Sequence, residues 1–368
     1  MYTIGLDVHA RKIAVCILDQ NGKRFKEMTL TSDVEKLARE LERLKKPCRI
    51  CYEASCGYGH LFDQLTRLPR VKRIAVAHPG RLRLIFLSKR KNDRVDAHKL
   101  ATLLFLDQVP EVYIPDIDVR AWRAAIEFRR KLVDRQTAVK NELRALLRSY
   151  GIATPYRQRL WTRKGLTWLA ELELPTPLAR LQRQCLLDEL DGCRLRLKEL
   201  ERDLDRIGNA YPGVQLLRTI PGVGPRTSEA VMAYIADPKR FQRGKQVGCY
   251  FGLVPCQDQS AGANRLGHIT REGPATVRKL LTEVTWQGIQ RSPEIRAFFE
   301  RVQRQDPGRK KIALVATAHW LVRVMWSMLR SGEESRFTRL TRKQEEAARS
   351  QAAPAASTKK RSKAPSAA

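Results

Sequence analysis

The sequence lacks the segments that would direct a chain into or across a membrane. No run of apolar residues reaches the roughly 20 that a transmembrane helix needs. The first residues, Met-Tyr-Thr-Ile-Gly-Leu-Asp, have no basic stretch before their apolar part, and we therefore expect no signal peptide. These absences predict a cytoplasmic protein with no membrane partner.

The sequence also lacks a cysteine pattern for disulfides or zinc, although it has eight cysteines. In a reducing cytosol these are expected to be free thiols. Cys48 and Cys51 form a CxxC pair, but no second pair of ligands is spaced to complete a zinc site. An offset of three along a strand also points the two thiols to opposite faces.

Acidic residues are few compared with basic ones. Asp and Glu total 39 against 70 Lys and Arg, which gives a net charge of +31 and a pI near 10.3. A field of this sign attracts polyanions, so nucleic acid is the expected partner. An acidic membrane surface is the weaker alternative, and a protein kept soluble by its charge is the plainest one. With 368 residues, 43% of them hydrophobic, the chain can form two or three domains with sizeable cores.

The first hundred residues alternate between strand and helix patterns. The order βββαβαβα predicts a mixed sheet, and it resembles the RNase H-like fold of resolvases, integrases and transposases. Asn21-Gly22 is a hairpin turn between the second and third strands, and His78-Pro79-Gly80 is read as a turn. The expected strands are residues 2–7, 12–18, 25–31, 49–53 and 73–77, and the expected helices are 33–45, 57–65 and 93–105.

Two long helices are expected next, at residues 119–150 and 178–207, joined by a Pro- and Gly-containing linker. Their apolar residues keep a heptad rhythm, which fits either an antiparallel hairpin or a dimerising coiled coil. The fold class is therefore α/β plus α. We predict an RNase H/RuvC-like metal-binding domain at 1–110, a helical coiled-coil domain at 111–209, a mostly helical transposase domain at 210–330 and a disordered basic tail at 331–368.

Four acidic residues stand where strands end or a helix begins. Asp7 and Glu53 end two strands that are adjacent in this fold, while Asp93 and Asp96 share one face of a helix. Mg²⁺ binds few protein carboxylates and keeps waters and phosphate oxygens as its other ligands. Together the four acids predict a Mg²⁺ or Mn²⁺ site for a phosphodiester. Taken singly, each could be a turn residue, an ion-pair partner, a helix cap or a solvated acid.

Residues 220–230, Ile-Pro-Gly-Val-Gly-Pro-Arg-Thr-Ser-Glu-Ala, predict a helix-hairpin-helix. Gly222 and Gly224 would let the backbone approach a phosphate, and the helix start at Arg226 and Thr227 would offer N–H groups to it. Such a hairpin holds DNA without reading its sequence, and the alternative is a turn that only packs two helices. The basic run Lys89-Arg90-Lys91 is a further candidate contact to nucleic acid.

Residues 251–273 predict a polar, glycine-rich loop within an otherwise helical region. The loop brings Ser260 together with the cations Arg265 and Arg271. A serine that attacks a phosphodiester needs cations to meet the negative charge of the transition state. On chemistry alone, Ser260 is either a nucleophile or a phosphate-binding or capping hydroxyl.

These motifs, in this order, resemble the DEDD transposases of bacterial insertion sequences, the recombinases described as bridge-RNA-guided. The resemblance spans about residues 1–330. It is carried by Gly-Leu-Asp-Val-His at 5–9, Tyr-Glu-Ala-Ser at 52–55, Asn-Asp-Arg-Val-Asp-Ala at 92–97, Ile-Pro-Gly-Val-Gly at 220–224, Gly-Leu-Val-Pro at 252–255 and Arg-Leu-Gly-His-Ile-Thr-Arg-Glu-Gly at 265–273.

The resemblance implies a RuvC-like domain that binds Mg²⁺ through Asp7, Glu53, Asp93 and Asp96. It implies a C-terminal domain in which Ser260 forms a covalent phosphoserine link to DNA. It further implies an active site assembled from two subunits, a tetrameric synapse, and a structured guide RNA that pairs with donor and target DNA.

The chain departs from the family at the serine. Where the family usually has Ser-Ser-Gly, this chain has Gln259-Ser260-Ala261, which leaves one hydroxyl as the nucleophile. We predict a DNA transposase and recombinase of the bacterial cytoplasm, acting as a dimer or tetramer. The alternatives are a metal-dependent resolvase or nuclease that hydrolyses with water, and an inactive remnant that only binds nucleic acid.

Overall fold

The computed structural model describes residues 1–55, 57–85, 92–260, 263–341 and 344. Contacts divide the chain into two compact units, Met1–Arg120 and Ala121–Ala368, and each is described by itself. The finer division into domains at 1–110, 111–209, 210–330 and 331–368 stays a prediction.

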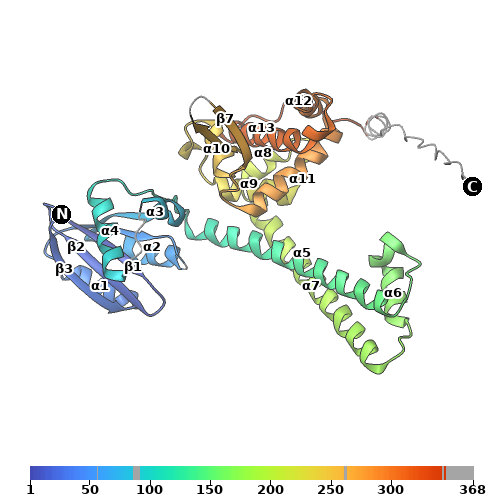
Figure 1. The fold of residues 1–368 in the computed structure, drawn as a ribbon, viewed down its shortest axis with the longest axis horizontal. Helices are drawn as coiled ribbons and strands as arrows, with labels where there is room; N and C mark the ends of the chain where they lie inside the picture. Colours follow the sequence, from blue (N-terminus) through green and yellow to red (C-terminus); the bar gives the residue numbers. More distant parts are fainter. Residues whose placement is uncertain (56, 86–91, 261–262, 342–343, 345–368) are drawn as a thin grey trace, which may run out of the picture. The chain divides into compact units, whose positions relative to one another are not determined.

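The first unit is built on a five-stranded mixed sheet with the strand order β3-β2-β1-β4-β5 (Figure 1). Strands β1, β2 and β3 form an antiparallel meander, because short turns join them. β4 then pairs in parallel with β1, and β5 pairs in parallel with β4. Gly22 adopts φ +77° in the hairpin turn between the second and third strands, where the turn was predicted. The predicted strands and their order are confirmed: β1 Tyr2–Val8, β2 Lys12–Leu18, β3 Arg24–Thr31, β4 Cys48–Glu53 and β5 Val71–Ala77.

Helices cover both faces of this sheet. α1 (Val34–Glu42) and α2 (Tyr58–Thr66) pack over one face, and α4 (Asp93–Phe105) packs over the other. Cys48 and Cys51 belong to hydrophobic clusters on opposite faces, and both are free thiols, as the strand offset predicts. One prediction was wrong. The expected turn at residues 78–80 opens a short helix, α3 (Pro79–Ile85), because proline is well tolerated in the first turn of a helix.

α5 (Ile117–Ser149) begins in the first unit and continues into the second, where α7 (Pro177–Asn209) runs back along it. The ion pairs Arg129–Glu201 and Arg135–Glu189 show the antiparallel direction, since a later residue of α5 meets an earlier residue of α7. Of the two arrangements predicted from the heptad pattern, the antiparallel hairpin of the two helices is thus the one seen within the chain. The connection is not the plain linker that was expected, because it contains η1 (Arg157–Trp161) and α6 (Arg163–Glu171), whose leucines and tryptophans pack between the helix ends.

The rest of the second unit is mostly helical, with one two-stranded hairpin, β6 (Pro255–Ser260) and β7 (Ala263–Ile269). Its central helix, α13, lies in a segment, Pro307–Ser331, that is long and apolar enough to cross a membrane by length and composition alone, which the sequence reading did not anticipate. Seven residues of α13 are buried in the core of the unit. The remaining helices are α8 Pro212–Leu217, α9 Pro225–Ile235, η2 Pro238–Arg240, α10 Gly244–Tyr250, α11 Ala275–Arg291, α12 Pro293–Gln303, η3 Pro307–Arg309 and α13 Lys310–Ser331.

Part of the segment after α13, within the predicted tail of residues 331–368, is attached to the unit. The Leu340 N–H donates to the Arg291 carbonyl at 2.9 Å, and the Ser335 N–H donates to Thr219 Oγ1 at 3.0 Å. The Phe337 ring lies 5.3 Å from that of Trp320. Residues 345–368, which hold the rest of the predicted tail, lie outside the described residues.

Candidate functional site

Asp7 lies near the end of β1 and is the most enclosed member of the predicted acidic set. The strand is buried from Tyr2 to Leu6, and the Asp7 side chain is 17% exposed. Burial raises the pKa of Asp7, the nearby His9 opposes this, and the charges of Asp93 and Asp96 raise it further. Three of the four predicted acids therefore influence one another electrostatically.

The close approach of α4 to β1 brings these acids together. A Cβ on Gly5 would lie 2.0 Å from the Ala97 carbonyl oxygen and 2.4 Å from the Ala101 nitrogen. Only glycine leaves room for the helix backbone at this position. Because Ala97 and Ala101 lie over Gly5, the preceding turn of α4, which carries Asp93 and Asp96, lies toward the Asp7 end of the strand.

Asp7, His9 and Asp93 place three possible metal-ligand atoms within 4.8 Å of one another. His9 Nε2 lies 3.1 Å from Asp7 Oδ2 and 3.6 Å from Asp93 Oδ1. His9 was missed as a site residue by the sequence reasoning. Its offset of two from Asp7 was the available signal, because alternate residues of an extended chain share a face.

Cations balance the acids on α4. Lys12 Nζ lies 2.5 Å from Asp93 Oδ2, and its hydrogen bond is the main cause of the lowered pKa of Asp93. Lys99 Nζ lies 3.0 Å from Asp96 Oδ1. A divalent cation here would take over carboxylate oxygens that Lys12 and His9 now contact. Carboxylate oxygens are the ligands that Mg²⁺ and Mn²⁺ prefer, so the donor set fits such an ion.

Glu53 shares the sheet face of Asp7 but stands apart from the three-residue group. In the parallel pairing of β1 with β4, Gly5 lies opposite Cys51, and residues paired in this way point to the same face. Two positions further along both strands, Asp7 and Glu53 are again on that face. The Glu53 side chain is exposed. The structure therefore places Glu53 at the neighbouring strand end, on the side that α4 covers.

Of the residues predicted to bind DNA in the glycine hairpin, Gly222 and Gly224 lie between α8 and α9, and Arg226 and Thr227 lie in the first turn of α9. Gly222 has φ +94°, and a Cβ there would lie 2.9 Å from the Gly288 nitrogen, so its close contact is with α11. Thr227 is buried, and Gly224, at the N-cap of α9, has open space around its Cα. The packing of Gly222 matches the alternative of a helix-packing turn, and DNA binding by the hairpin stays a prediction. Lys89, Arg90 and Lys91 lie outside the described residues.

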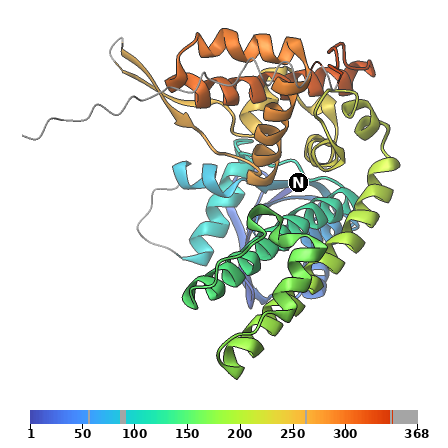
Figure 2. The same ribbon diagram turned by 90° about the vertical axis from the view of Figure 1, so that its right-hand side faces the viewer.

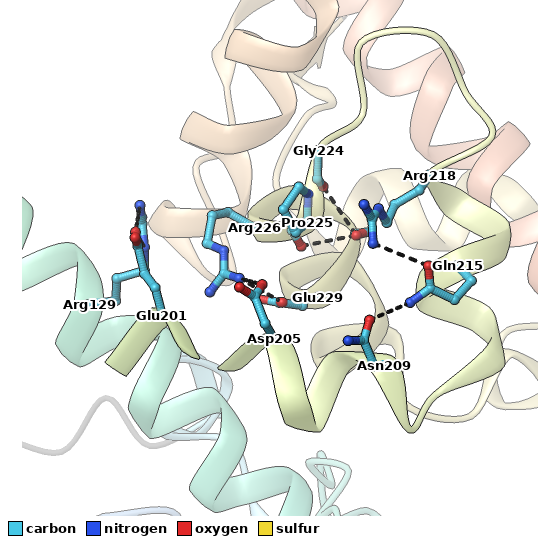
Figure 3. Close-up of polar contacts among 11 residues, drawn as sticks. Arg129, Glu201, Asp205, Asn209, Gln215, Arg218, Gly224, Pro225, Arg226 and Glu229 are labelled. Carbon is cyan, nitrogen blue, oxygen red and sulfur yellow. Dashed lines mark hydrogen bonds and ion pairs between the residues drawn. The ribbon is translucent and has the colours of Figure 1, made fainter. Parts of the chain in front are cut away.

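Arg226 faces two acids of its own unit (Figure 3). It forms ion pairs with Asp205 of α7 and, at 3.2 Å, with Glu229 of α9. Gly208 permits this approach of α7, because a Cβ there would lie 2.9 Å from Glu229 Oε1. Glu229 is buried, and burial is the main reason that its pKa rises to about 7, with Arg226 opposing and Asp205 adding to the rise.

The titration of Glu229 predicts a pH-dependent stability that Glu229→Gln removes. Between the usual carboxyl pKa and about 7, the folded protein holds a proton that the unfolded chain has lost. Stability therefore falls as pH rises through this window, by about 3 kcal/mol for such a shift. Urea unfolding of both proteins at about pH 5 and pH 8, followed by tryptophan fluorescence, measures the difference.

Fluorescence reports on the second unit, because all six tryptophans lie beyond residue 120. The fall in unfolding free energy from the lower to the higher pH is expected to be smaller in the variant than in the wild type. Equal falls in the two proteins would contradict the raised pKa.

The predicted serine loop is a β-hairpin, which corrects the loop assignment. β6 and β7 pair with Gln257 opposite Leu266 and Gln259 opposite Asn264, and Figure 2 shows the two strands extending away from the helices of this unit. Apolar, β-branched alternation is weak here, so the sequence did not indicate strands. Ser260 ends β6, and its side chain lies outside the described residues.

The predicted cations of this hairpin are both exposed. Arg265 lies on β7, and Arg271 follows the strand with φ +55°. The charge of Arg271 helps burial to lower the pKa of Arg278. The guanidinium groups of Arg271 and Arg278 therefore lie near each other, just after the end of β7.

Sequence comparisons place this site in a known family. Residues 4–152 match a model of the DEDD transposases of IS110, described as "Transposase", and residues 214–300 match "Transposase IS116/IS110/IS902 family". The chain belongs to the IS110/IS116 family of insertion-sequence transposases. The first match contains all four predicted acids, and the second contains the glycine hairpin and Ser260. The resemblance to the DEDD transposases of insertion sequences is thereby confirmed.

Two relatives of this transposase match along most of its length, and a third matches over about a third of it. The chain is 28% identical over 303 residues to a "Probable family 20 transposase" of Pseudomonas aeruginosa, covering 79% of this chain and 86% of the relative. It is 25% identical over 342 residues to the "Transposase for insertion sequence element IS1111A" of Coxiella burnetii, covering 90% and 91%. A "Pilin gene-inverting protein" of Moraxella lacunata is 25% identical over 140 residues, covering 36% and 43%.

Proposed function

We propose that this insertion-sequence transposase cuts and rejoins DNA with two chemical groups, a divalent-metal site on a RuvC-like domain and the hydroxyl of Ser260. The observation that carries the proposal is the convergence of Asp7, His9 and Asp93 within 4.8 Å, beside Asp96. Carboxylates held this close repel one another, and a cation bound between them relieves that repulsion. The protein as a whole carries a net charge of +31, which repels cations. A local group of acids that attracts a cation is therefore unusual in this chain.

Asp7, Glu53, Asp93 and Asp96 would hold Mg²⁺ or Mn²⁺, with His9 beside them. Such an ion polarises a phosphoryl oxygen and neutralises charge that develops in the transition state. The chain's own contribution is to fix these carboxylates, through the seating of α4 on Gly5, and to place Lys12 where it can contact a phosphate oxygen once Asp93 turns to the ion.

Ser260 is proposed as the nucleophile. Its Oγ attacks the phosphorus, a new Oγ–P bond forms, and the bond from phosphorus to the leaving strand oxygen breaks. The serine proton passes to that leaving oxygen, directly or through a base. A strand-end hydroxyl then attacks the phosphoserine link, which frees Ser260 and joins the strands. Arg265 and Arg271 are the cations proposed to meet the charge of this transition state.

The proposed partners are donor DNA, target DNA and a structured guide RNA, bound by a homo-oligomer, a dimer or tetramer, in the bacterial cytoplasm. Gly222, Gly224, Arg226 and Thr227 are proposed to lie at a DNA-backbone contact, together with residues 89–91. These assignments rest on the resemblance of the motifs.

A plasmid joining assay tests the proposal. Purified protein is mixed with donor and target plasmids and Mg²⁺, with or without RNA transcribed from the non-coding end of the element. Joined product is expected only when both the RNA and the metal are present, and EDTA is expected to abolish it. Joining that persists in EDTA would contradict the metal site, and joining without RNA would contradict guidance.

A metal-dependent nuclease or resolvase is the second candidate, and the acidic group by itself favours it, because metal and water suffice for hydrolysis. Its signature is cleaved DNA with free ends and no covalent adduct. Tight nucleic-acid binding with neither cleavage nor joining would instead indicate an inactive remnant.

A further inference from the structure

A charged groove of about 690 Å³ runs between α5 and α7, two helices that lie side by side in the second unit (Figure 2). Both helices supply its cations and its apolar floor. The lining residues are Arg129, Val133, Gln136, Arg194, Leu197, Lys198, Glu201, Arg202 and Asp205. Arg194, Lys198 and Arg202 follow one another at intervals of four, so they share one face of α7.

The acids of the groove are already engaged, which leaves some of its cations uncompensated. Glu201 lies 2.5 Å from Arg129 Nη2, and Asp205 pairs with Arg226, as Figure 3 shows. Across the described part of the chain, neither Lys198 nor Arg202 forms an ion pair, and both are exposed. The groove therefore presents positive charge that no acid among the described residues neutralises.

The positive charge continues from the groove toward the indole of Trp161. Arg194 Nη2 donates a hydrogen bond to the Trp161 carbonyl oxygen at 3.1 Å. Lys140 Nζ and Arg144 Cζ lie 5.7 Å and 5.0 Å from the centre of the Trp161 ring. Lys140 also donates to Gln136, a groove residue, at 3.2 Å. The cluster around Trp161 and the groove are thus one continuous surface.

The cations of this surface crowd one another. Burial is the main cause of the lowered pKa of Lys140, and the charges of Arg194 and Arg144 lower it further. Like charges held close together repel one another. A bound anion would offset this repulsion, because each of the cations attracts it. The stretch of α5 from Arg129 to Arg144 is about 22 Å long at 1.5 Å per residue. One strand of a duplex carries about six phosphates over that length.

We propose that the α5–α7 groove, together with the cations around Trp161, binds the phosphodiester backbone of a nucleic acid. Binding is through phosphates and not bases, because the groove offers Lys and Arg head groups, and the Trp161 ring is already covered by Lys140 and Arg144. The inference rests on the proposed function only in taking nucleic acid as the polyanion. DNA and RNA share the phosphodiester that the groove would recognise.

The test is the double variant Lys198→Gln with Arg202→Gln in the full-length protein. Its affinity for a fluorescent DNA duplex of arbitrary sequence, and for a single-stranded RNA, is measured by anisotropy over a range of KCl concentrations. Removing two phosphate contacts is expected to weaken binding of every sequence. The slope of log affinity against log salt should become less negative by about 2. A change with only one of the two probes identifies whether DNA or RNA occupies the groove.

The matched control is Arg196→Gln with Lys131→Gln, which removes the same charge from α7 and α5 away from the groove, since Lys131 is exposed and lies two residues from both Arg129 and Val133. Arg196 lies two residues from both Arg194 and Lys198, so it points to the opposite side of the helix. The control is expected to keep the wild-type slope. Equal slopes in the two variants would overturn the proposal. So would a groove variant that changes the sedimentation coefficient but not the slope, since the groove would then be an interface between two copies.

The plasmid joining assay, run on the same preparations, separates this proposal from the proposed function. If the wild type joins no DNA but the groove variant still has a less negative salt slope than the wild type, the groove proposal is supported and the proposed joining function is not. If the wild type joins DNA and the groove variant binds with an unchanged slope, the groove fails and the function stands.

Discussion

Replacing Asp7 with asparagine is expected to reduce strand joining by about 10²–10³-fold, the loss that follows when one group stabilising transition-state charge is removed. Asparagine keeps the shape of the side chain and an oxygen that can accept from His9. It removes the negative charge that would hold a divalent ion at the site of Asp7, His9 and Asp93. The measurement is the yield of joined plasmid against time at saturating Mg²⁺.

The fold should survive this substitution. Burial and the neighbouring charges of Asp93 and Asp96 raise the pKa of Asp7, so the folded state disfavours its ionised form. An uncharged asparagine removes that penalty, and the unfolding free energy above neutral pH is expected to stay the same or rise. A variant that lost activity by unfolding would show the opposite. Glu42→Gln, an exposed acid at the end of α1, is the matched control and should join DNA at the wild-type rate.

Replacing Ser260 with alanine is expected to abolish the covalent protein–DNA adduct and to reduce joining by about 10⁴-fold or more, as removal of a nucleophile does elsewhere. The adduct is measured as labelled DNA that migrates with the protein on a denaturing gel. Alanine removes the only atom that forms the bond to phosphorus and leaves the strand pairing of β6 with β7 in place.

Gln259→Ala, one residue earlier on β6, is the control and should keep both the adduct and the joined product. An adduct that persists in Ser260→Ala would assign the nucleophile to another residue. Cleaved DNA with free ends and no adduct, formed by Ser260→Ala and by the wild type alike, would favour the metal-dependent alternative, in which Asp7→Asn alone removes activity. The pair of substitutions therefore separates the two mechanisms.

Local signals explain why the first unit was predicted well. Alternating apolar residues marked β1 and β2, Asn21-Gly22 marked the turn between the second and third strands, and the Asp33 side chain caps α1. Asn92 caps α4 in the same way, so the helix starts at Asp93 and carries both acids in its first turn. Each of these signals depends only on residues that are close to one another in the sequence, so it can be recognised without knowledge of the tertiary structure.

Contacts between distant residues explain what the sequence did not show. The approach of a phosphate to Gly222 stays a prediction, and the structure adds a close contact of Gly222 with Gly288 of α11 that no pattern near Gly222 reveals. The hairpin of β6 and β7 is short and polar, and its strands lack the alternation that burial of one face produces. The segment from Ser335 to Leu340 is held by hydrogen bonds to residues far earlier in the chain, and its composition alone suggested disorder.

The sequence by itself determined the charge of the protein, the order of the five strands in its first unit, the positions of Asp7, Glu53, Asp93 and Asp96 at element ends, and its family. The tertiary structure decided that His9 joins Asp7 and Asp93 and that Lys12 pairs with Asp93. It also decided that Lys198 and Arg202 lie in a groove where they form no ion pair with any described residue. The reason is that propensities and caps act over a few residues, whereas ion pairing and burial depend on which surfaces packing brings within a few ångströms.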